Sequence, residues 1–185
     1  MRLITAPERF DPDSFDVVVF LSGSIEMGKA KPWRHNVITA LSGFGDNVIV
    51  LNPRRDDWDD TWVQEADFEP FREQVEWELF GIERADVMAI HFQAQTYAPI
   101  TLLELGLVAW DLDKTGVVVY CEPGYWRRGN VEIVAKRYGS AWAKDWDSFI
   151  SGVVRSTALA CVGVDDTWGI HRTTGITRAI LEGKL

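Results

Sequence analysis

The sequence predicts an α/β fold with a doubly wound parallel sheet of four to five strands and helices on both faces. Four short runs rich in β-branched residues are apolar throughout rather than alternating, as is typical of parallel strands that are covered on both sides. A segment with the apolar spacing of a helix follows each run. Because strands and helices alternate in this way, we expect one doubly wound sheet in a single domain over residues 1–185.

The expected elements follow one another in a regular order. Strands are predicted at residues 16–21, 47–51, 86–92 and 116–121, and helices at residues 32–43, 67–84, 99–113, 129–138 and 145–160. The second helix is indicated by one apolar stripe at steps of three or four residues. The third begins with Pro99, a favourable first helical residue. Residues 161–185 show only one further short helical pattern, at 176–183.

Composition excludes several classes of protein. The 28 acidic and 19 basic residues give a formal charge of −9, which argues against a broad nucleic-acid surface. No apolar run approaches the ~20 residues of a membrane helix, and the first residues lack the apolar core of a signal peptide. Two cysteines, Cys121 and Cys161, predict a reducing cytoplasm and buried thiols. The histidines His35, His91 and His171 lack metal-ligand spacing, so we expect no metal or other cofactor.

The segment after the first expected strand has part of the pattern of a phosphate-binding P-loop. Gly23, Gly28 and Lys29 stand at the required spacing, and the next residue should supply the hydroxyl that holds a magnesium ion. That residue is Ala30. We therefore interpret the segment as the floor of a binding site without a metal, since ligands of doubly wound sheets bind beyond the carboxyl ends of the strands. Its backbone amides could also receive a phosphate, with Lys29 as a helper.

Residues 53–66 form a long connection between the second strand and the second helix. It carries Trp58 and Trp62 among many charged residues and is too long for a plain turn. It is either a lid over the site or a solvated acidic loop. Arg54 and Arg55, at its start, either bind a phosphate or base or neutralise the acidic residues beside them.

Glu104 is the most unusual residue of the sequence. It lies in the stretch PITLLELGL, an expected helix that is apolar on nearly every side, and burying a carboxylate costs several kcal/mol unless it has a partner. The side chain is either a rim carboxylate paired with an arginine or a nucleophile that the helix presents to the cleft. Gly106, in the same helix, suggests that something packs closely there.

Several segments together resemble the nucleoside 2-deoxyribosyltransferase family, in particular its transferase-like branch. They lie between Val17 and Arg137 and read FLSGSIEMGKAKPW, VLNPRRDDWDDTW, QVEWELFGIERADV, PITLLELGL and YWRRGNVEIV. The resemblance implies a flavodoxin-like fold and a metal-free enzyme that cleaves or exchanges the N-glycosidic bond of deoxynucleosides through a deoxyribosyl-enzyme intermediate. A base captures the sugar in the transferases, and water captures it in the related 2′-deoxynucleoside 5′-phosphate N-hydrolases.

The resemblance also implies roles for individual residues. Glu104 matches the nucleophile, and Glu78 stands where the family usually has an Asp that binds the sugar and positions the nucleophile. Gly23 and Ser24 match the loop close to the sugar. Phe20 occupies a position where several members have a Tyr whose hydroxyl touches the nucleophile, so that interaction should be missing here.

Two further positions concern the leaving base and the oligomer. Ala98 stands where the transferases carry an Asp, and the phosphate hydrolases a Ser, so its methyl group leaves activation of the leaving base unexplained. Asn130 resembles an Asn that reaches a neighbouring subunit's site; alternatively it caps a helix that starts near Val131. The resemblance thus implies a homodimer or higher homo-oligomer with a shared active site.

The roles of the tryptophans and of the remaining basic pair are inferred from their positions in the sequence alone. Trp58, Trp62 and Trp126 lie in loops near the expected cleft and could stack on a base. Trp77 and Trp110 are expected to pack inside, and the pair Arg127 and Arg128 faces either substrate or solvent. The function expected first is transfer of the sugar between bases, with nucleotide N-hydrolysis as the close alternative and a non-catalytic nucleotide-binding sensor as the alternative of another class.

Overall fold

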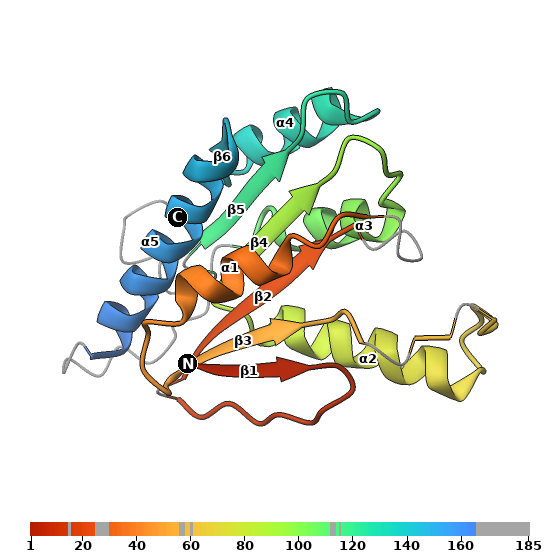
Figure 1. The fold of residues 1–185 in the computed structure, drawn as a ribbon, viewed down its shortest axis with the longest axis horizontal. Coiled ribbons are helices and arrows are strands. Elements are labelled where there is room, and N and C mark those ends of the chain that lie inside the picture. Colours follow the sequence, from red (N-terminus) through yellow and green to blue (C-terminus); the bar gives the residue numbers. More distant parts are fainter. Residues whose placement is uncertain are drawn as a thin grey trace, which may run out of the picture.

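The chain folds around one six-stranded sheet in the computed structural model, which describes residues 1–14, 16–24, 30–55, 58–59, 61–111, 114 and 116–165. The elements, in chain order, are β1 (Arg2–Thr5), β2 (Val17–Gly23), α1 (Arg34–Leu41), β3 (Val48–Asn52), α2 (Glu69–Arg84), β4 (Val87–Phe92), α3 (Pro99–Val108), β5 (Gly116–Cys121), α4 (Arg128–Arg137), β6 (Ala141–Ala143) and α5 (Trp146–Asp165). Figure 1 shows the strands side by side with the helices packed against them.

The sheet confirms the predicted doubly wound fold but has more strands than expected. Its order is β1-β3-β2-β4-β5-β6, and every pair is parallel. The prediction of four to five strands missed β1 and β6. Both are edge strands of four and three residues, and each pairs with a single neighbour. Such short edge strands need not be apolar, and Leu3 of β1 is in fact exposed.

Helices cover both faces of the sheet. The face formed by Val18 and Phe20 of β2 packs against α2, α3 and α4, whereas the face formed by Val17 and Val19 packs against α1 and α5. The two layers are visible in Figure 1. Burial on both sides is the physical reason for the continuously apolar runs that predicted the inner strands.

The point at which the winding reverses lies between β2 and β4. From β2 the chain moves through α1 to β3 on one side, and then returns through α2 to β4 on the other side. The inner strands thereby follow the flavodoxin-type order, whose ligands bind beyond the carboxyl ends of the two strands at the reversal. The loops after β2 and β4 and the start of α3 meet at this place.

Four expectations about the helices and their neighbouring residues were wrong. Helix α3 ends at Val108 instead of residue 113, and Trp110, which was expected to pack inside, is 68% exposed. Nothing lies within 4 Å of a side chain added at Gly106, so no part of the described chain packs closely there. Helix α4 begins at Arg128, so Asn130 lies within its first turn and does not cap it.

Other expectations are confirmed or lie outside the described residues. Trp77 is buried, and its indole N–H donates to the Glu8 carbonyl at 2.8 Å. Cys121 is buried as expected, whereas Cys161 is only partly buried. The helical pattern at 176–183 and His171 lie outside the described residues. None of the helices in the part of the chain that the structure describes is long and apolar enough to cross a membrane.

Replacement of Gly81 by Ala tests the packing of α2 on β2. An added Cβ would lie 2.9 Å from the ring of Phe20 and 3.1 Å from Leu51, two side chains with no exposed surface. Because neither neighbour has room to move, we expect Gly81→Ala to lower the free energy of unfolding by about 1–3 kcal/mol in urea titrations.

Gly129→Ala is the matched control, because nothing lies within 4 Å of the added carbon in α4. Ala is preferred to Gly in a helix by about 0.5–1 kcal/mol, so this variant should be as stable as the unaltered protein or more so. Equal losses in the two variants would contradict the close packing of α2.

Candidate active site

Helix α3 differs from an ordinary surface helix, because it buries polar side chains and exposes large apolar ones. Its buried side carries Thr101 and Glu104 together with Leu105, while its outer side exposes Ile100 and Leu103. Surface helices normally bury their apolar stripe and expose their charges. The fold therefore places a carboxylate inside the molecule and leaves large apolar side chains outside.

The Glu104 carboxylate lies at the reversal point of the sheet, against the end of β2. The residue is 7% exposed, and the hydroxyl of Ser22 donates to its Oε2 at 2.5 Å. Burial raises the pKa of Glu104 from 4.5 to about 7; the Ser22 hydrogen bond opposes this rise, the negative charge of Glu78 adds to it, and Arg34 opposes it. A carboxyl with this pKa exchanges its proton near neutral pH, which is the range in which active-site carboxyls work.

Glu78 approaches the same place from α2. Its pKa is raised by burial, and this rise is opposed by the hydrogen bond from Gln74 and by the charge of Arg34. The Gln74 amide donates both to Glu78 Oε1 and to the carbonyl of Pro53, each at 2.8 Å. Gln74 therefore links the second carboxylate to the end of β3 and fixes its orientation.

Arg34, at the start of α1, is the basic member of the cluster. Its residue is 6% exposed, although arginine is seldom buried without partners. The guanidinium donates from Nε to the Leu21 carbonyl at 3.2 Å and from Nη2 to the Gly23 carbonyl at 2.8 Å. Burial lowers its pKa from 12.5 to about 10, and the charge of Glu104 opposes this effect, so the side chain remains cationic at neutral pH.

The two residues expected in the loop after β2 have structural partners. Ser24 is buried, and its hydroxyl lies 2.7 Å from the hydroxyl of Thr96, in the loop after β4. A carbon added at Gly23 would lie 2.7 Å from both the His91 carbonyl and the Trp33 ring, so only glycine fits there. Residues 25–29, which include Lys29 and Gly28, lie outside the described residues.

Lys31 and Gln93 join the two loops further along. The Lys31 amide donates to Gln93 Oε1 at 2.8 Å, and Gln93 Nε2 donates to the Lys31 carbonyl at 2.7 Å. The chain on both sides of 25–29 is thus attached to the segment that follows β4. This double attachment sets the position of the floor of the site relative to α3.

Phe20 and Ala98 border the carboxylate cluster. Phe20 is fully buried two residues before Ser22 on the same face of β2, and its ring lies 6.3 Å from that of Trp77. Ala98 precedes α3 in the left-handed region, with φ 44° and ψ 52°. This conformation costs a residue other than glycine on the order of 1 kcal/mol, and such strain clusters at functional sites.

The loop after β3 is organised around Trp62. The rings of Trp58 and Trp62 lie 5.0 Å apart, and the Arg55 guanidinium lies over the Trp62 ring at 4.9 Å. Arg55 also forms an ion pair with Glu73 of α2 at 3.9 Å. The charge of Arg54, by contrast, acts on Arg34 beside the two carboxylates. The acidic residues 56, 57 and 60 lie outside the described residues.

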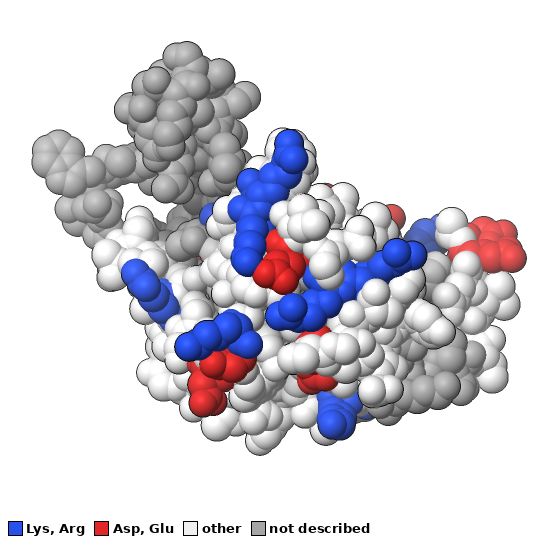
Figure 2. Space-filling model, turned by 90° about the horizontal axis from the view of Figure 1, so that it is seen from above, with Lys and Arg blue, Asp and Glu red and all other residues white. Residues whose placement is uncertain are grey.

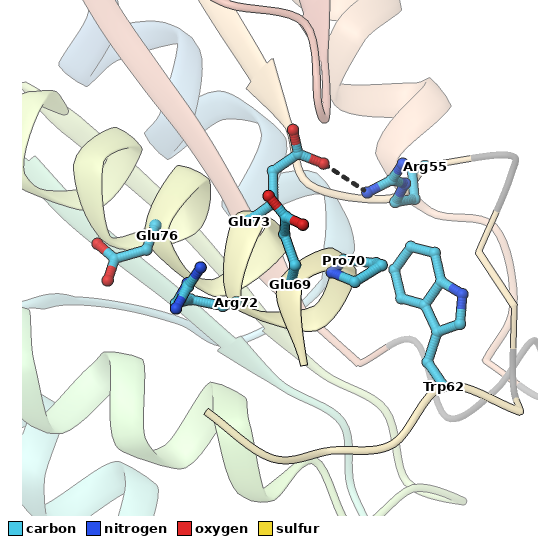
Figure 3. Close-up of a pocket in the computed structure, with 7 residues that line it drawn as sticks. All are labelled: Arg55, Trp62, Glu69, Pro70, Arg72, Glu73 and Glu76. Atoms are coloured by element: carbon cyan, nitrogen blue, oxygen red, sulfur yellow. Dashed lines mark ion pairs between the residues drawn. The ribbon is translucent and has the colours of Figure 1, made fainter. Parts of the chain in front are cut away.

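A hollow of about 510 Å³ lies between this loop and the outer side of α2 (Figure 3). It is lined by Arg55, Trp62, Glu69, Pro70, Arg72, Glu73 and Glu76. Neither Glu104 nor Glu78 lines it. The hollow that Arg55 and Trp62 border is therefore separate from the cluster of Glu104 and Glu78.

The region after β5 supplies exposed aromatic and basic groups at the same edge of the sheet. Trp126 is half exposed and donates from its indole N–H to the Tyr97 carbonyl at 3.1 Å, and Arg127 lies over its ring at 4.4 Å. Arg128 is held by Glu132 at 3.4 Å. Asn130 is exposed. In the view of Figure 2, Lys and Arg side chains are more prominent than Asp and Glu, although the chain is acidic overall.

Sequence reasoning identified the two carboxylates but missed Ser22, Arg34 and Gln74. Ser22 was accessible in principle, because it lies two residues after Phe20 and side chains two apart share a face of a strand. Arg34 offered a weaker signal, because a cation at the first position of a helix opposes the helix dipole. No pattern distinguished Gln74 from other polar residues of α2.

A doubly wound sheet with the buried Glu104 and the half-buried Glu78 at its reversal point defines a flavodoxin-type protein with a candidate small-molecule site. The family model described as "Nucleoside 2-deoxyribosyltransferase like" matches residues 16–125, which is more than half of the chain. The protein therefore belongs to the nucleoside 2-deoxyribosyltransferase-like family. No curated protein matches it.

Among the described residues, no group of three His, Cys, Asp or Glu side chains is arranged to hold a metal ion.

The raised pKa of Glu104 predicts a pH-dependent gain in stability when its charge is removed. Its folded pKa of about 7 exceeds the ordinary value of 4.5. The fold is therefore most stable, relative to the unfolded chain, below about pH 4.5, where this carboxyl is protonated in both states. That stability is lost as the pH rises through about 7 and the buried group ionises. We expect the stability of Glu104→Gln relative to the unaltered protein to increase by on the order of 1–3 kcal/mol between pH 4.5 and pH 8.

Urea titrations at the two pH values measure this difference. Glu76→Gln, on the exposed surface of α2, is the control and should show no comparable change between the two conditions. An unchanged stability difference for Glu104→Gln would mean that the carboxyl is not destabilised by burial.

Proposed function

We propose that the protein cleaves the N-glycosidic bond of a deoxynucleoside or deoxynucleotide through a covalent intermediate on Glu104, and that it transfers the sugar to a second base. The observation that carries the proposal is the buried Glu104 carboxylate, which Ser22 holds by Oε2 at the ligand-binding edge of the sheet. Family membership supports an enzyme acting on nucleosides. A binding pocket without turnover would gain little from burying a carboxylate.

The chemistry follows from nucleophilic displacement at the anomeric carbon. An oxygen of ionised Glu104 forms a bond to C1′ while the bond from C1′ to the base nitrogen breaks, and the base leaves with the electron pair. A nitrogen of the second base then attacks C1′ and releases the carboxylate. Glu78 is proposed to bind the sugar hydroxyls, with Gln74 fixing its orientation. The leaving base takes its proton from a group other than Ala98, which has only a methyl group.

Hydrolysis of a deoxynucleoside 5′-monophosphate is the second candidate. It is favoured by Arg54, whose charge acts on Arg34, and by Arg127, which lies beside the exposed Trp126. Guanidinium groups bind phosphate through paired hydrogen bonds. Water would then replace the second base as the group that attacks C1′.

Incubation with deoxynucleosides and with their monophosphates, each with and without a second base, separates these functions. Exchange of the base indicates transfer, and release of free base alone indicates hydrolysis. Binding without reaction on any of these substrates would support a nucleotide-binding sensor and would contradict both enzymatic proposals.

Glu104→Gln should lose at least about 10³-fold in turnover while it still binds substrate, because an amide is a far poorer nucleophile than a carboxylate. Intact-mass analysis with a slowly reacting substrate should show a deoxyribosyl adduct on the unaltered protein and none on the variant. Glu76→Gln serves again as the control. Substantial turnover by Glu104→Gln would remove this residue from the nucleophile role.

We further propose that the active form is a homo-oligomer in which a second copy covers the outer side of α3. Ile100, Leu103 and Leu107 are exposed there, and Gly106 leaves space for a close approach. No charged side chain lies on this side of the helix, so two copies of a chain with net charge −9 could meet there without direct repulsion. Asn130 and Trp126, both exposed, are proposed to contribute to the neighbouring site.

A charge introduced on the outer side of α3 should dissociate the oligomer. We expect Leu103→Glu to yield monomers in light scattering and to lose most of the activity, because the new carboxylate would be buried without a partner. Leu159→Glu makes the same change at an exposed leucine of α5, on the opposite layer, and should alter neither property.

Mixing two inactive variants tests whether the site is shared. A dimer of one Glu104→Gln subunit and one Asn130→Ala subunit retains one intact site, so activity should return, up to about half of the normal value per mixed dimer. The absence of recovery despite verified subunit exchange would show that each subunit works with its own Asn130.

A further inference from the structure

Strand β2 extends beyond the strand that pairs with it on one side. Its pairing with β3 ends at Phe20 and Leu51, whereas its pairing with β4 continues to Gly23 and His91. The Ser24 amide donates to the His91 carbonyl, on the β4 side. Because successive backbone groups of a strand point to opposite sides, the carbonyls of Leu21 and Gly23 point away from β4, to the side where β3 has ended.

Arg34 occupies this open edge. Its Nε and Nη2 atoms donate to the carbonyls of Leu21 and Gly23 at 3.2 and 2.8 Å. The guanidinium thus supplies the two hydrogen bonds that a continued strand β3 would have supplied. These two carbonyls flank Ser22, whose hydroxyl donates to Glu104 Oε2, so Arg34 braces the backbone on either side of the residue that holds the carboxylate.

The positive charge of Arg34 also acts on the pKa of both carboxylates. The charged groups that act on it are Glu104, Arg54 and Glu78, of which Glu104 has the largest effect. Among the described residues, Arg34 is the basic side chain that lowers the pKa of both Glu104 and Glu78. Removing its charge while Glu78 remains would therefore raise the pKa of Glu104 further.

We propose that Arg34 is a positioning residue for Glu104: its planar fork completes the edge of β2 beyond the end of β3 and so fixes Ser22, and its charge favours the ionised form of Glu104. Two separate properties of arginine serve these two roles, the fork geometry and the permanent charge. The inference rests on the proposed function, in which ionised Glu104 is the nucleophile.

Two substitutions separate the two roles. Arg34→Gln removes the charge but keeps an amide that can donate to a carbonyl, and Arg34→Lys keeps the charge but loses the fork. For Arg34→Gln we expect the acid limb of the kcat/KM pH profile to move up by about one unit or more, with part of the lost rate returning at high pH. For Arg34→Lys we expect the limb to stay in place while kcat falls about 10-fold at every pH, because an ammonium group does not span both carbonyls.

Arg84→Gln, an exposed arginine in the last turn of α2, is the control and should leave both the rate and the limb unchanged. A purely structural role for Arg34 would lower stability and rate without moving the limb. An unmoved limb in Arg34→Gln would overturn the charge role, and an undiminished rate in Arg34→Lys would overturn the fork role. If Arg34→Gln does not fold, Arg34→Lys still decides, because a moved limb in that variant also contradicts the charge role.

A titration that needs no turnover distinguishes this inference from the proposed function. The carboxyl carbon of Glu104, labelled with ¹³C and assigned by its loss in Glu104→Gln, reports the protonation of this group directly by NMR. A higher midpoint in Arg34→Gln than in the unaltered protein supports the charge role even if no glycosidic bond is cleaved, in which case the proposed function alone fails. Equal midpoints in an active enzyme would refute the charge role and leave the function standing.

Discussion

The burial of the Glu104 carboxylate is the constraint on which the rest of this structure depends. Removing a carboxylate from water is expensive, and a single hydrogen bond does not offset the cost. Here the pKa of the group remains raised to about 7 in spite of the Ser22 hydrogen bond and the Arg34 charge. The site therefore compensates the burial only in part, and the remaining cost falls on the stability of the fold. An incompletely stabilised carboxylate is also a more reactive one.

Several features that look unrelated in the sequence help to position the Glu104 carboxylate. Gly23, next to Ser22, lets β2 pass close to Trp33 and His91. The left-handed turn at Ala98 leads directly into the helix that carries Glu104. Gln93 and Thr96 join the loop after β4 to the chain that follows β2. Together these contacts hold the two strands at the reversal point and the start of α3 as one unit.

The sequence predicted the fold class and singled out Glu104, each for an identifiable physical reason, whereas Glu78 was indicated only by the family resemblance. The inner strands were recognisable because burial on both faces makes them apolar throughout. Glu104 was recognisable because a charge within an apolar helix is costly. By contrast, Ser22 and Arg34 act through contacts with residues distant in sequence, and β1 and β6 pair on one side only, so neither leaves a periodic pattern.

The errors at Trp110 and Gly106 share a cause. Both positions were interpreted on the assumption that apolar or small residues of a helix face the interior of the same chain. In α3 this assumption fails in part: the interior side holds Thr101 and Glu104 beside Leu105, whereas Ile100, Leu103 and Leu107 face outwards. A prediction based on hydrophobic periodicity identifies which residues avoid water, but it does not say whether the covering surface belongs to the same molecule.

The exposed apolar side chains of α3 link the proposed oligomer to the concentration of the protein. Covering a side chain of the size of Leu or Ile contributes roughly 1.5–3 kcal/mol, and the outer side of α3 offers Ile100, Leu103 and Leu107 for this purpose. If a second copy covers them, association stabilises the packed position of α3 and offsets part of the free-energy cost of burying Glu104. The size of this contribution depends on the concentration of the protein. Dilution would then destabilise the buried position of Glu104 without any change in the residues of the site. The cellular abundance of the protein would set the fraction of it that is competent to react.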